Sequence, residues 1–225
     1  MKTNAREVNE RMLRVAKEVM DKFAEVGTAT IHEAQGQIGA MDNAIKPIDP
    51  TRRLIGRALT VDTRPADNLM IHYALTKAQP GDVLVVDAKG FTEAGPWGDI
   101  LTLAAQKVGL SGLVIDGMVR DADVIVELGF PVFCRGLSIK GTNKAQPGRV
   151  NEAVLCGGVT VNPGDVVVGD RDGVVVVSAE RAEEVLAASE AREAKEEAMR
   201  ADLNAGKTTV ELLGLEPLLK QMGAQ

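Results

Sequence analysis

Two short segments of the chain carry the residues whose types and spacing are best suited to chemistry. The first, residues 94–101, reads Ala-Gly-Pro-Trp-Gly-Asp-Ile-Leu, and Gly95 and Gly98 allow its backbone to approach a ligand closely. Asp99 then begins a predicted helix, and the N-terminus of a helix presents free N–H groups to anions. We therefore expect a substrate carboxylate to bind the backbone of four consecutive residues, Gly98, Asp99, Ile100 and Leu101.

The second segment, residues 116–121, ends with an arginine and an aspartate side by side. In a regular strand Arg120 and Asp121 point to opposite faces, but in a turn that follows Gly117 and enters a helix they can converge on one pocket. Arginine is always protonated and forks onto oxygen anions, so Arg120 suits the negative charge that develops on an enolate. Asp121 offers hard carboxylate oxygens to a divalent metal ion, Mg²⁺ or Mn²⁺.

The same residues also have a purely structural interpretation. Asp121 can cap the following helix, Arg120 can pair with a surface acid, and the glycines can be ordinary turn residues. The residue types alone leave both interpretations open. Asp87 and Asp116, which also end predicted strands, are interpreted as turn formers.

The elements that must position these segments alternate between strands and helices. Short apolar runs typical of strands occupy residues 54–63, 83–87, 113–116 and 132–134. Helical patterns occupy residues 67–78, 99–108 and 121–128. This alternation predicts an α/β fold of parallel βα units, in which ligands gather at the carboxyl ends of the strands. After Gly141 the runs at residues 159–161, 166–168 and 174–177, joined by Gly and Asp turns, predict an antiparallel part.

Helices are also predicted before this central part. Apolar residues recur at spacings of three and four from Val8 onward, which predicts a helix within residues 1–27. Thr30 followed by Glu33 predicts a capping box that opens a short second helix.

A long helix is predicted after the central part. Residues 179–205 are rich in Ala, Glu, Arg and Lys, and Gly206 stands where a C-terminal cap is expected. Because the apolar face of this helix is thin, we expect the extension 179–225 to contact a neighbouring subunit. We interpret residues 1–225 as a single domain with helical extensions at both ends.

Composition narrows the class of protein. The 225 residues include 26 basic and 32 acidic side chains, and no basic stripe with interleaved aromatics is present, so we expect no nucleic acid partner. The apolar runs are too short to span a bilayer and the polar N-terminus lacks a signal-peptide core, so we expect a cytoplasmic chain without membrane contact. Cys134 and Cys156 lie in strand-like runs and are interpreted as buried thiols.

Several separated motifs, in this order, resemble one known family: Ala29-Thr30-Ile31-His32-Glu33-Ala34, Asp67-Asn68, Pro80-Gly81-Asp82, Gly98-Asp99, Asp116-Gly117-Met118-Val119-Arg120-Asp121, Lys140-Gly141-Thr142, and Arg192-Glu193-Ala194-Lys195-Glu196 followed by Arg200. The chain resembles the 4-hydroxy-4-methyl-2-oxoglutarate / 4-carboxy-4-hydroxy-2-oxoadipate aldolases, a class II pyruvate aldolase family that shares its fold with the ribonuclease regulator RraA. The resemblance covers nearly the whole chain.

The resemblance implies an RraA-like β/β/α swivelling-type domain, assembled as a homotrimer or homohexamer with active sites between subunits. It implies that Asp121 binds the divalent metal directly, while Asp99 and Glu196 hold water molecules of that metal, Glu196 from the neighbouring subunit. It also implies that the backbone from Gly98 to Leu101 holds the pyruvyl carboxylate and that Arg120 holds the C2 oxygen. Among the residues alone, Glu196 and Arg200 are equally well explained as a solvated i,i+4 pair, and Glu193 and Glu197 lie close by.

The expected reaction is a retro-aldol cleavage of a small oxo acid that releases pyruvate, with oxaloacetate decarboxylation through the same enolate. The alternative is a regulatory protein of the RraA type that inhibits a ribonuclease by protein contact, since a shared fold does not fix function.

Four further residues are weighed for a place in the site. His72 is interpreted as a packing residue, while His32 lies inside a matched motif without an evident partner. Lys140 and Lys144 are candidates to receive a distal substrate carboxylate, or are simply solvated.

Overall fold

The valine-rich runs of the sequence form a nine-stranded sheet in the computed structural model, which describes residues 15–223. The main path of the sheet is β1-β5-β4-β3-β2-β10-β11, with β6 paired to β4 and β7 paired to β2. Its strands are β1 (Lys46–Pro47), β2 (Leu54–Asp62), β3 (Asp82–Phe91), β4 (Gly112–Val119), β5 (Val132–Cys134), β6 (Gly136–Leu137), β7 (Arg149–Val150), β10 (Val166–Asp170) and β11 (Gly173–Val177). A separate two-stranded sheet contains β8 (Val154–Cys156) and β9 (Val159–Val161).

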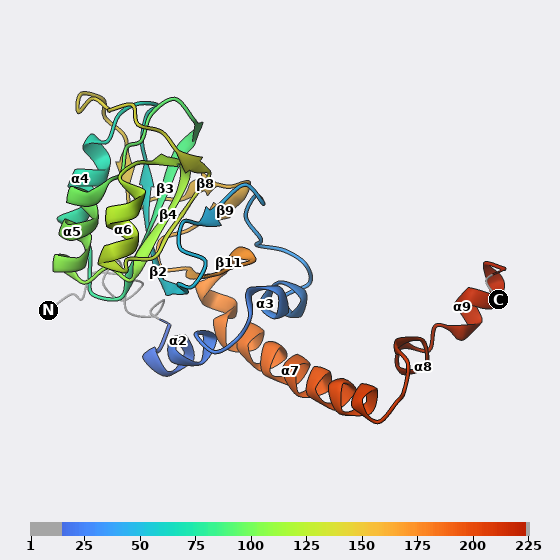
Figure 1. Cartoon of the computed structure of the whole chain (residues 1–225). Coiled ribbons are helices and arrows are strands. Elements are labelled where there is room, and N and C mark those ends of the chain that lie inside the picture. The colour runs from blue at the N-terminus through green and yellow to red at the C-terminus, as the bar shows by residue number, and fades with distance from the viewer. Residues whose placement is uncertain (1–14, 224–225) are drawn as a thin grey trace, which may run out of the picture.

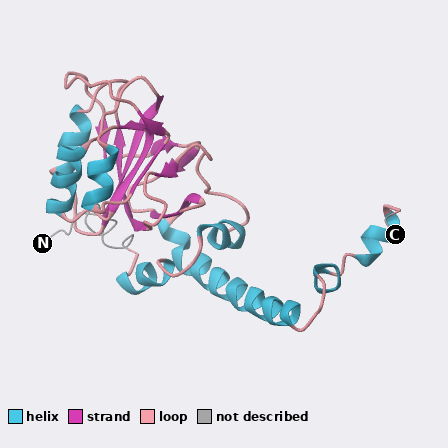
Figure 2. Ribbon diagram, in the orientation of Figure 1, coloured by secondary structure: helices cyan, strands magenta, loops and turns pink. Residues whose placement is uncertain are grey.

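The half of the sheet built from β2, β3, β4 and β5 is parallel, as the sequence predicts. The connections are the helices α4 (Leu69–Leu75), α5 (Asp99–Val108) and α6 (Ala122–Leu128). Figures 1 and 2 show these three helices side by side on one face of the sheet. Because the strands are covered on both faces, residues 83–86 are all completely buried. The carboxyl ends of β2, β3 and β4 therefore open onto the loops that lead into α4, α5 and α6.

The other half of the sheet is antiparallel, which confirms the change of character predicted after Gly141. Strand β10 pairs antiparallel with both β11 and β2. Alternate valines of β10 and β11 face two different layers: Val167 and Val174 pack with Phe133, whereas Val166 and Val175 pack beneath helices. The small sheet β8-β9 covers the face opposite α4, α5 and α6, where Val154 and Val161 join the layer that contains Phe133.

The N-terminal helices pack on the antiparallel edge. They are α2 (Lys17–Phe23) and α3 (Thr28–Ala34), with Phe23 and Ile31 buried against β10, β11 and the long C-terminal helix. The helix predicted from Val8 is present as α2 in its second half, and residues 1–14 lie outside the described part of the chain.

The predicted capping box at Thr30 and Glu33 is wrong. Helix α3 begins at Thr28 with Gly27 at the N-cap, so Thr30 lies inside the helix. The carboxylate of Asp170, at the end of β10, accepts the amide N–H of Thr28 at 2.9 Å and its hydroxyl at 2.7 Å. A tertiary acceptor therefore satisfies the first turn, and no local capping side chain is needed.

The C-terminal extension is helical, as predicted. It contains a 3-10 turn (Ala179–Arg181), α7 (Ala182–Asn204), α8 (Thr209–Leu213) and α9 (Glu216–Gln221). Gly206 follows α7 in the left-handed conformation (φ 95°) expected of a helix-terminating glycine. Only the first turns of α7 are buried, and beyond them α7, α8 and α9 extend away from the sheet (Figure 1). No helix within residues 15–223 is both long and apolar enough to cross a membrane.

Candidate active site

The two chemistry-bearing segments meet at the carboxyl end of β4. Trp97 forms a parallel bridge with Val119, the last residue of β4, and the amide of Arg120 donates to the carbonyl of Trp97 at 2.9 Å. The Trp97 ring is completely buried, donates to the Thr102 hydroxyl at 2.7 Å and stacks on Phe130. This packed ring fixes the 94–98 segment beside the end of β4.

Arg120, Asp121 and the start of α5 form one corner. The Nε atom of Arg120 lies 3.4 Å from Oδ2 of Asp121, and the same oxygen accepts the backbone N–H of Asp99 at 3.3 Å. The convergence of Arg120 and Asp121 that the sequence analysis left open is therefore present. We call this group, Arg120, Asp121 and the amide of Asp99, the catalytic corner, after the role proposed for it below.

The local backbone at the catalytic corner depends on two special positions. Asp121 is in the left-handed region (φ 56°), which turns the chain from β4 into α6 and brings its side chain beside Arg120. Its carboxylate makes no capping bond to α6, so the helix-cap interpretation is wrong. A Cβ atom on Gly98 would lie 2.3 Å from Oδ2 of Asp121, so only glycine permits this approach.

A pocket of about 340 Å³ opens beside the catalytic corner. Arg120 and all four predicted backbone positions line it, together with residues from other loops. The lining residues are Asn68, His72, Gly95, Pro96, Trp97, Gly98, Asp99, Ile100, Leu101, Arg120, Gly141, Thr142 and Lys144. Backbone amides of the first turn of α5 already donate to carboxylates: the amide of Asp99 donates to Oδ2 of Asp121 at 3.3 Å, and the amide of Ile100 donates to Oδ1 of Asp99 at 2.7 Å. This wall is therefore suited to an anionic substrate group.

The donor set at the corner fits a magnesium-like ion only in part. Within residues 15–223 no three carboxylate, histidine or cysteine side chains are close enough to form a metal site. Asp121 and the partly buried Asp99 supply two carboxylates near this corner, and the backbone amide of Asp99 donates to Oδ2 of Asp121. Mg²⁺ commonly uses one or two protein carboxylates and completes its shell with water and substrate oxygens, so this pair fits such an ion.

Glu196 does not join the pocket of its own chain. It lies on α7, where it pairs with Arg192 at 2.9 Å and with Arg200 at 4.0 Å, and Arg192 also contacts Glu33. The i,i+4 pair of Glu196 and Arg200 considered from the sequence is thus present at the limit of an ion pair. Beyond its buried first turns α7 extends away from the sheet (Figure 1), and Glu196 does not line the pocket.

Two polar side chains of the pocket wall were not assigned to the site from the sequence. Oδ1 of Asn68 and Nε2 of His72 are buried without a hydrogen-bond partner, and both residues line the pocket. Burial, followed by the nearby charge of Lys144, lowers the pKa of His72, so its imidazole is neutral at pH 7. The sequence favoured a packing role for His72. Both residues follow the carboxyl end of β2, and β2 lies beside β3 and β4, which carry the corner. This position at the end of a parallel strand could have identified them from the sequence.

Of the remaining candidates, one lines the pocket and the others do not. Lys144 lines the pocket, whereas Lys140 forms an ion pair with Glu93 and does not. His32 also lies elsewhere, with Nδ1 3.0 Å from the carbonyl oxygen of Ile38. The predicted buried thiols are confirmed: Cys134 and Cys156 are free and buried, and burial raises the pKa of Cys134 to about 11.

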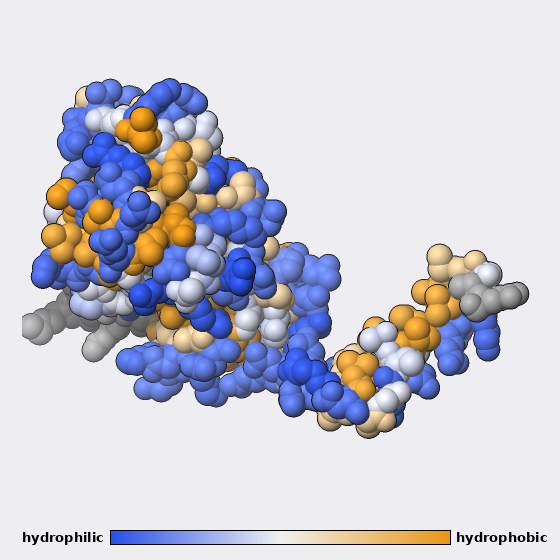
Figure 3. Space-filling model, in the orientation of Figure 1, coloured by the Kyte–Doolittle hydropathy of each residue, from blue (hydrophilic) through white to orange (hydrophobic). Residues whose placement is uncertain are grey.

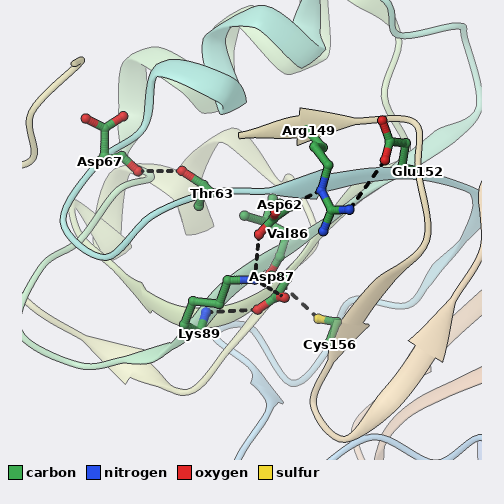
Figure 4. A network of polar contacts seen from close by, with 9 residues as sticks. All are labelled: Asp62, Thr63, Asp67, Val86, Asp87, Lys89, Arg149, Glu152 and Cys156. Atoms are coloured by element: carbon green, nitrogen blue, oxygen red, sulfur yellow. Dashed lines mark hydrogen bonds and ion pairs between the residues drawn. The ribbon is translucent and has the colours of Figure 1, made fainter. Parts of the chain in front are cut away.

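The strand-end aspartates Asp87 and Asp116 are held in buried ion pairs. Asp87 and Asp62 each lie 2.5 Å from the ammonium of Lys89, and Arg149 adds a second cation to Asp62 at 3.2 Å (Figure 4). Asp116 pairs with Arg135 and also accepts the amide of Gly157 at 2.9 Å. They do more than form turns, and neither lines the pocket.

Comparison with known proteins places this geometry in a family. The chain matches the RraA-like family, described as Aldolase/RraA, over residues 19–176. It is 37% identical over 177 residues to a Halalkalibacterium halodurans protein named "Putative 4-hydroxy-4-methyl-2-oxoglutarate aldolase", a match that covers 79% of this chain and 84% of the relative.

Solved structures agree with this assignment and confirm the RraA-like fold expected from the sequence. An uncharacterized protein from Pseudomonas syringae aligns with a TM-score of 0.80 at 30% identity, covering 87% of this chain and 92% of that one. Streptomyces coelicolor RraAS2, described as an unusual member of the RNase ES inhibitor RraA protein family, aligns with a TM-score of 0.76 at 32% identity, covering 84% of this chain and 100% of that one. The chain belongs to the RraA-like family of aldolase and RraA proteins.

Proposed function

We propose that the chain is a divalent-metal-dependent aldolase. Its substrate is a 4-hydroxy-2-oxo dicarboxylic or tricarboxylic acid, 4-hydroxy-4-methyl-2-oxoglutarate or 4-carboxy-4-hydroxy-2-oxoadipate, and its products are pyruvate and a second oxo acid. The observation that carries the proposal is the catalytic corner, where a guanidinium, a carboxylate and a helix N-terminus meet beside a pocket. The name of the H. halodurans relative supports the same reaction class.

The metal, Mg²⁺ or Mn²⁺, is proposed to be held beside the pocket by the two aspartates of the corner, by Asp121 directly and by Asp99 through water. When bound, it would draw electron density from the 2-oxo group of the substrate. Glu196 of the partner subunit is proposed to supply the third carboxylate, since Glu196 of the same chain does not line the pocket.

The residues of the corner have distinct proposed roles in the reaction. The first amides of α5, from Gly98 to Leu101, bind the pyruvyl carboxylate, and the guanidinium of Arg120 binds the C2 oxygen. A base removes the proton of the C4 hydroxyl, C4 becomes a carbonyl carbon, and the C3–C4 bond breaks.

The electron pair of the broken bond forms a C2–C3 double bond and leaves negative charge on the C2 oxygen, which Arg120 stabilises. Protonation of C3 then gives pyruvate. Oxaloacetate reaches the same enolate by losing carbon dioxide, so we propose its decarboxylation as a second activity.

The loop wall of the pocket, at Gly141, Thr142 and Lys144, has the chemistry for the other end of such a substrate. Lys144 is a cation at this wall, whereas Lys140 is already paired with Glu93. We therefore assign the distal carboxylate to Lys144 and not to Lys140. Nε2 of the neutral His72 and Oδ1 of Asn68 are buried and unpartnered in the same pocket, and Oδ1 of Asn68 can accept a hydrogen bond from a substrate hydroxyl.

The proposed active form is a homotrimer or homohexamer in which the C-terminal extension contacts a neighbouring subunit. Beyond its first turns α7 contributes no buried residue, and α8 and α9 contribute none. Their apolar side chains are exposed instead, among them Leu213, Leu218, Leu219 and Met222, the last with 74% exposure. Figure 3 shows this apolar surface along the extended C-terminal segment. A surface of this kind on a soluble protein marks an interaction site.

The decisive experiment measures pyruvate release from 4-hydroxy-4-methyl-2-oxoglutarate with and without a chelator, with oxaloacetate as a second substrate. We expect release that stops with chelator and returns when Mg²⁺ or Mn²⁺ is restored. Arg120→Ala should lower both activities by about 100-fold or more, while Arg181→Ala, which removes a partly exposed arginine that pairs with Glu184 and does not line the pocket, should change neither. Pyruvate release that is insensitive to the chelator would remove the metal from the proposal.

A second candidate function is ribonuclease inhibition by protein contact. It is favoured by the structural match to RraAS2, whose description names an RNase ES inhibitor family. The two functions are separated by the same assay: no pyruvate release from either substrate, together with inhibition of a ribonuclease E-type enzyme by the purified chain, would support this candidate instead.

A further inference from the structure

The loop at residues 141–147 forms one wall of the pocket although it is largely exposed to solvent. Gly141, Thr142 and Lys144 of this loop line the pocket. Holding an exposed loop in one conformation has an entropic cost, which must be offset by specific contacts. The contacts that hold this loop therefore also determine where Lys144 lies.

The loop is tied to the start of α4 by Asp67, a residue that is only 1% exposed. Oδ2 of Asp67 accepts the amide of Ala145 at 2.7 Å and that of Gln146 at 3.1 Å, while Oδ1 accepts the amide of Leu69 at 2.9 Å. One buried side chain thus joins the loop that carries Lys144 to the helix that carries His72.

Backbone bonds complete the attachment on the other side of Lys144. The amide of Asn68 donates to the carbonyl of Asn143 at 3.0 Å, and the amide of Asn143 donates to the carbonyl of Ala66 at 2.8 Å. Asp67 itself is fixed to the end of β2, because the Thr63 hydroxyl donates to its carbonyl at 2.8 Å (Figure 4). Lys144 is therefore bracketed by Asn143 and Ala145, both bound to the 66–68 segment.

We propose that Asp67 is a positioning residue that sets substrate specificity, because it holds Lys144 where the distal carboxylate of the substrate binds. The proposal rests on the proposed function for the identity of that substrate. Asp67 does not line the pocket, so it acts through the loop and touches no reacting atom.

A double-mutant cycle tests the proposal. Asp67→Asn keeps the size of the side chain but loses the charge and one acceptor, and Lys144→Met removes the cation. In each single variant the KM for 4-carboxy-4-hydroxy-2-oxoadipate should rise about tenfold, the loss expected for one charge-assisted hydrogen bond, with kcat changed by less than about twofold. The inhibition constant of oxalate, which occupies only the pyruvyl end, should change by less than about twofold.

The double variant separates positioning from general damage. If Asp67 acts through Lys144, the double variant should resemble Lys144→Met alone. Effects that multiply, or a KM and an oxalate constant that rise together, would overturn the proposal. The control is Asp49→Asn, which alters an aspartate that accepts the amide and hydroxyl of Thr51 near the opposite ends of the strands, and it should change neither constant.

A second variant and a second readout cover the case in which Asp67→Asn does not fold. Ala145→Pro removes one amide that Asp67 accepts and leaves its bond to Leu69 intact, so it should raise the same KM without affecting oxalate. Backbone hydrogen exchange needs no turnover. It should show faster exchange at Gln146 in either variant, and unchanged exchange there would contradict the proposal even in a chain that cleaves none of these substrates.

Discussion

Two groups of charged residues lie toward the carboxyl ends of the parallel strands and differ in how far solvent reaches them. The first is the catalytic corner, where the side chains of Arg120 and Asp121 are 45% and 37% exposed. The second is the cluster of Asp62, Asp87 and Lys89, whose two carboxylates are 6% and 8% exposed and share the ammonium of Lys89.

The difference teaches which strand-end carboxylates are available for chemistry. In the Asp62–Lys89 cluster each buried carboxylate is neutralised by a cation from the same chain, so it contributes to stability and has little capacity for a ligand. At the catalytic corner one cation and one amide share a single carboxylate oxygen at 3.3 to 3.4 Å, and solvent reaches both side chains. The arrangement at the corner suits a site that substrate completes.

The largest expected effect is on catalysis, from Arg120→Ala. Removing the proposed partner of the enolate oxygen should lower kcat for both aldol cleavage and oxaloacetate decarboxylation by about 100-fold or more. The thermal midpoint should change little, because Arg120 is nearly half exposed. Steady-state kinetics together with a thermal melt check this, and wild-type turnover in the variant would refute the assignment of the corner.

The converse change, Lys89→Met, should damage stability more than chemistry. It leaves Asp87 buried without this cation and leaves Asp62 with Arg149 alone. We expect a loss of about 2 kcal/mol in the free energy of unfolding, below the value for a fully buried pair because Lys89 is partly exposed. Urea unfolding measures it. Lys17→Met, which breaks the exposed pair with Asp21, is the matched control and should leave the midpoint unchanged.

Acid should weaken both the Asp62–Lys89 cluster and the attachment of the 141–147 loop by Asp67. Burial raises the pKa of Asp62, but the ion pairs with Lys89 and Arg149 lower it by more, so the pKa of Asp62 lies below its usual value. The pKa of Asp67 is lowered in the same way, because the hydrogen bonds from the amides of Ala145, Leu69 and Gln146 outweigh burial. A folded-state pKa below the unfolded value gives stability that is present above about pH 4 and is lost as pH falls through the folded pKa.

Thermal melts between pH 3 and pH 7 test this expectation. The midpoint should be level from pH 7 to about pH 5 and then fall. Asp67→Asn should flatten part of the fall, because Asn does not titrate. An acid slope identical to that of the wild-type chain would show that Asp67 contributes no linked stability.

The smallest expected effect on the folded chain comes from deleting residues 207–225. None of the described residues in this segment is buried against the body, so the thermal midpoint of the monomeric unit should barely change. Light scattering should instead show a smaller assembly, because the apolar surface of α8 and α9 is removed. An unchanged oligomer would locate the subunit contacts elsewhere.

Much of the fold was predictable because its signals are local. The buried apolar runs predicted β3, β4 and β5 as parallel strands and β2 as a strand, and Asp99–Val108 was predicted at the bounds that α5 has. The start of α3 was predicted wrongly, because the acceptor for its first turn is Asp170, 142 positions away in the chain. A capping partner at that distance leaves no pattern in the neighbouring sequence.

By itself the sequence determined the chemistry available at the site: an arginine next to an aspartate after one strand, and a glycine before an acidic helix start after another. The tertiary structure decided which charges are free to use, because neutralisation by Lys89, Arg149 or Arg135 depends on strands meeting in space. It also decided that Lys144, and not Lys140, faces the pocket, since the anchor at Asp67 is a contact across 78 positions. Residue type fixes what a side chain can do, whereas burial and long-range pairing fix whether it is available to do it.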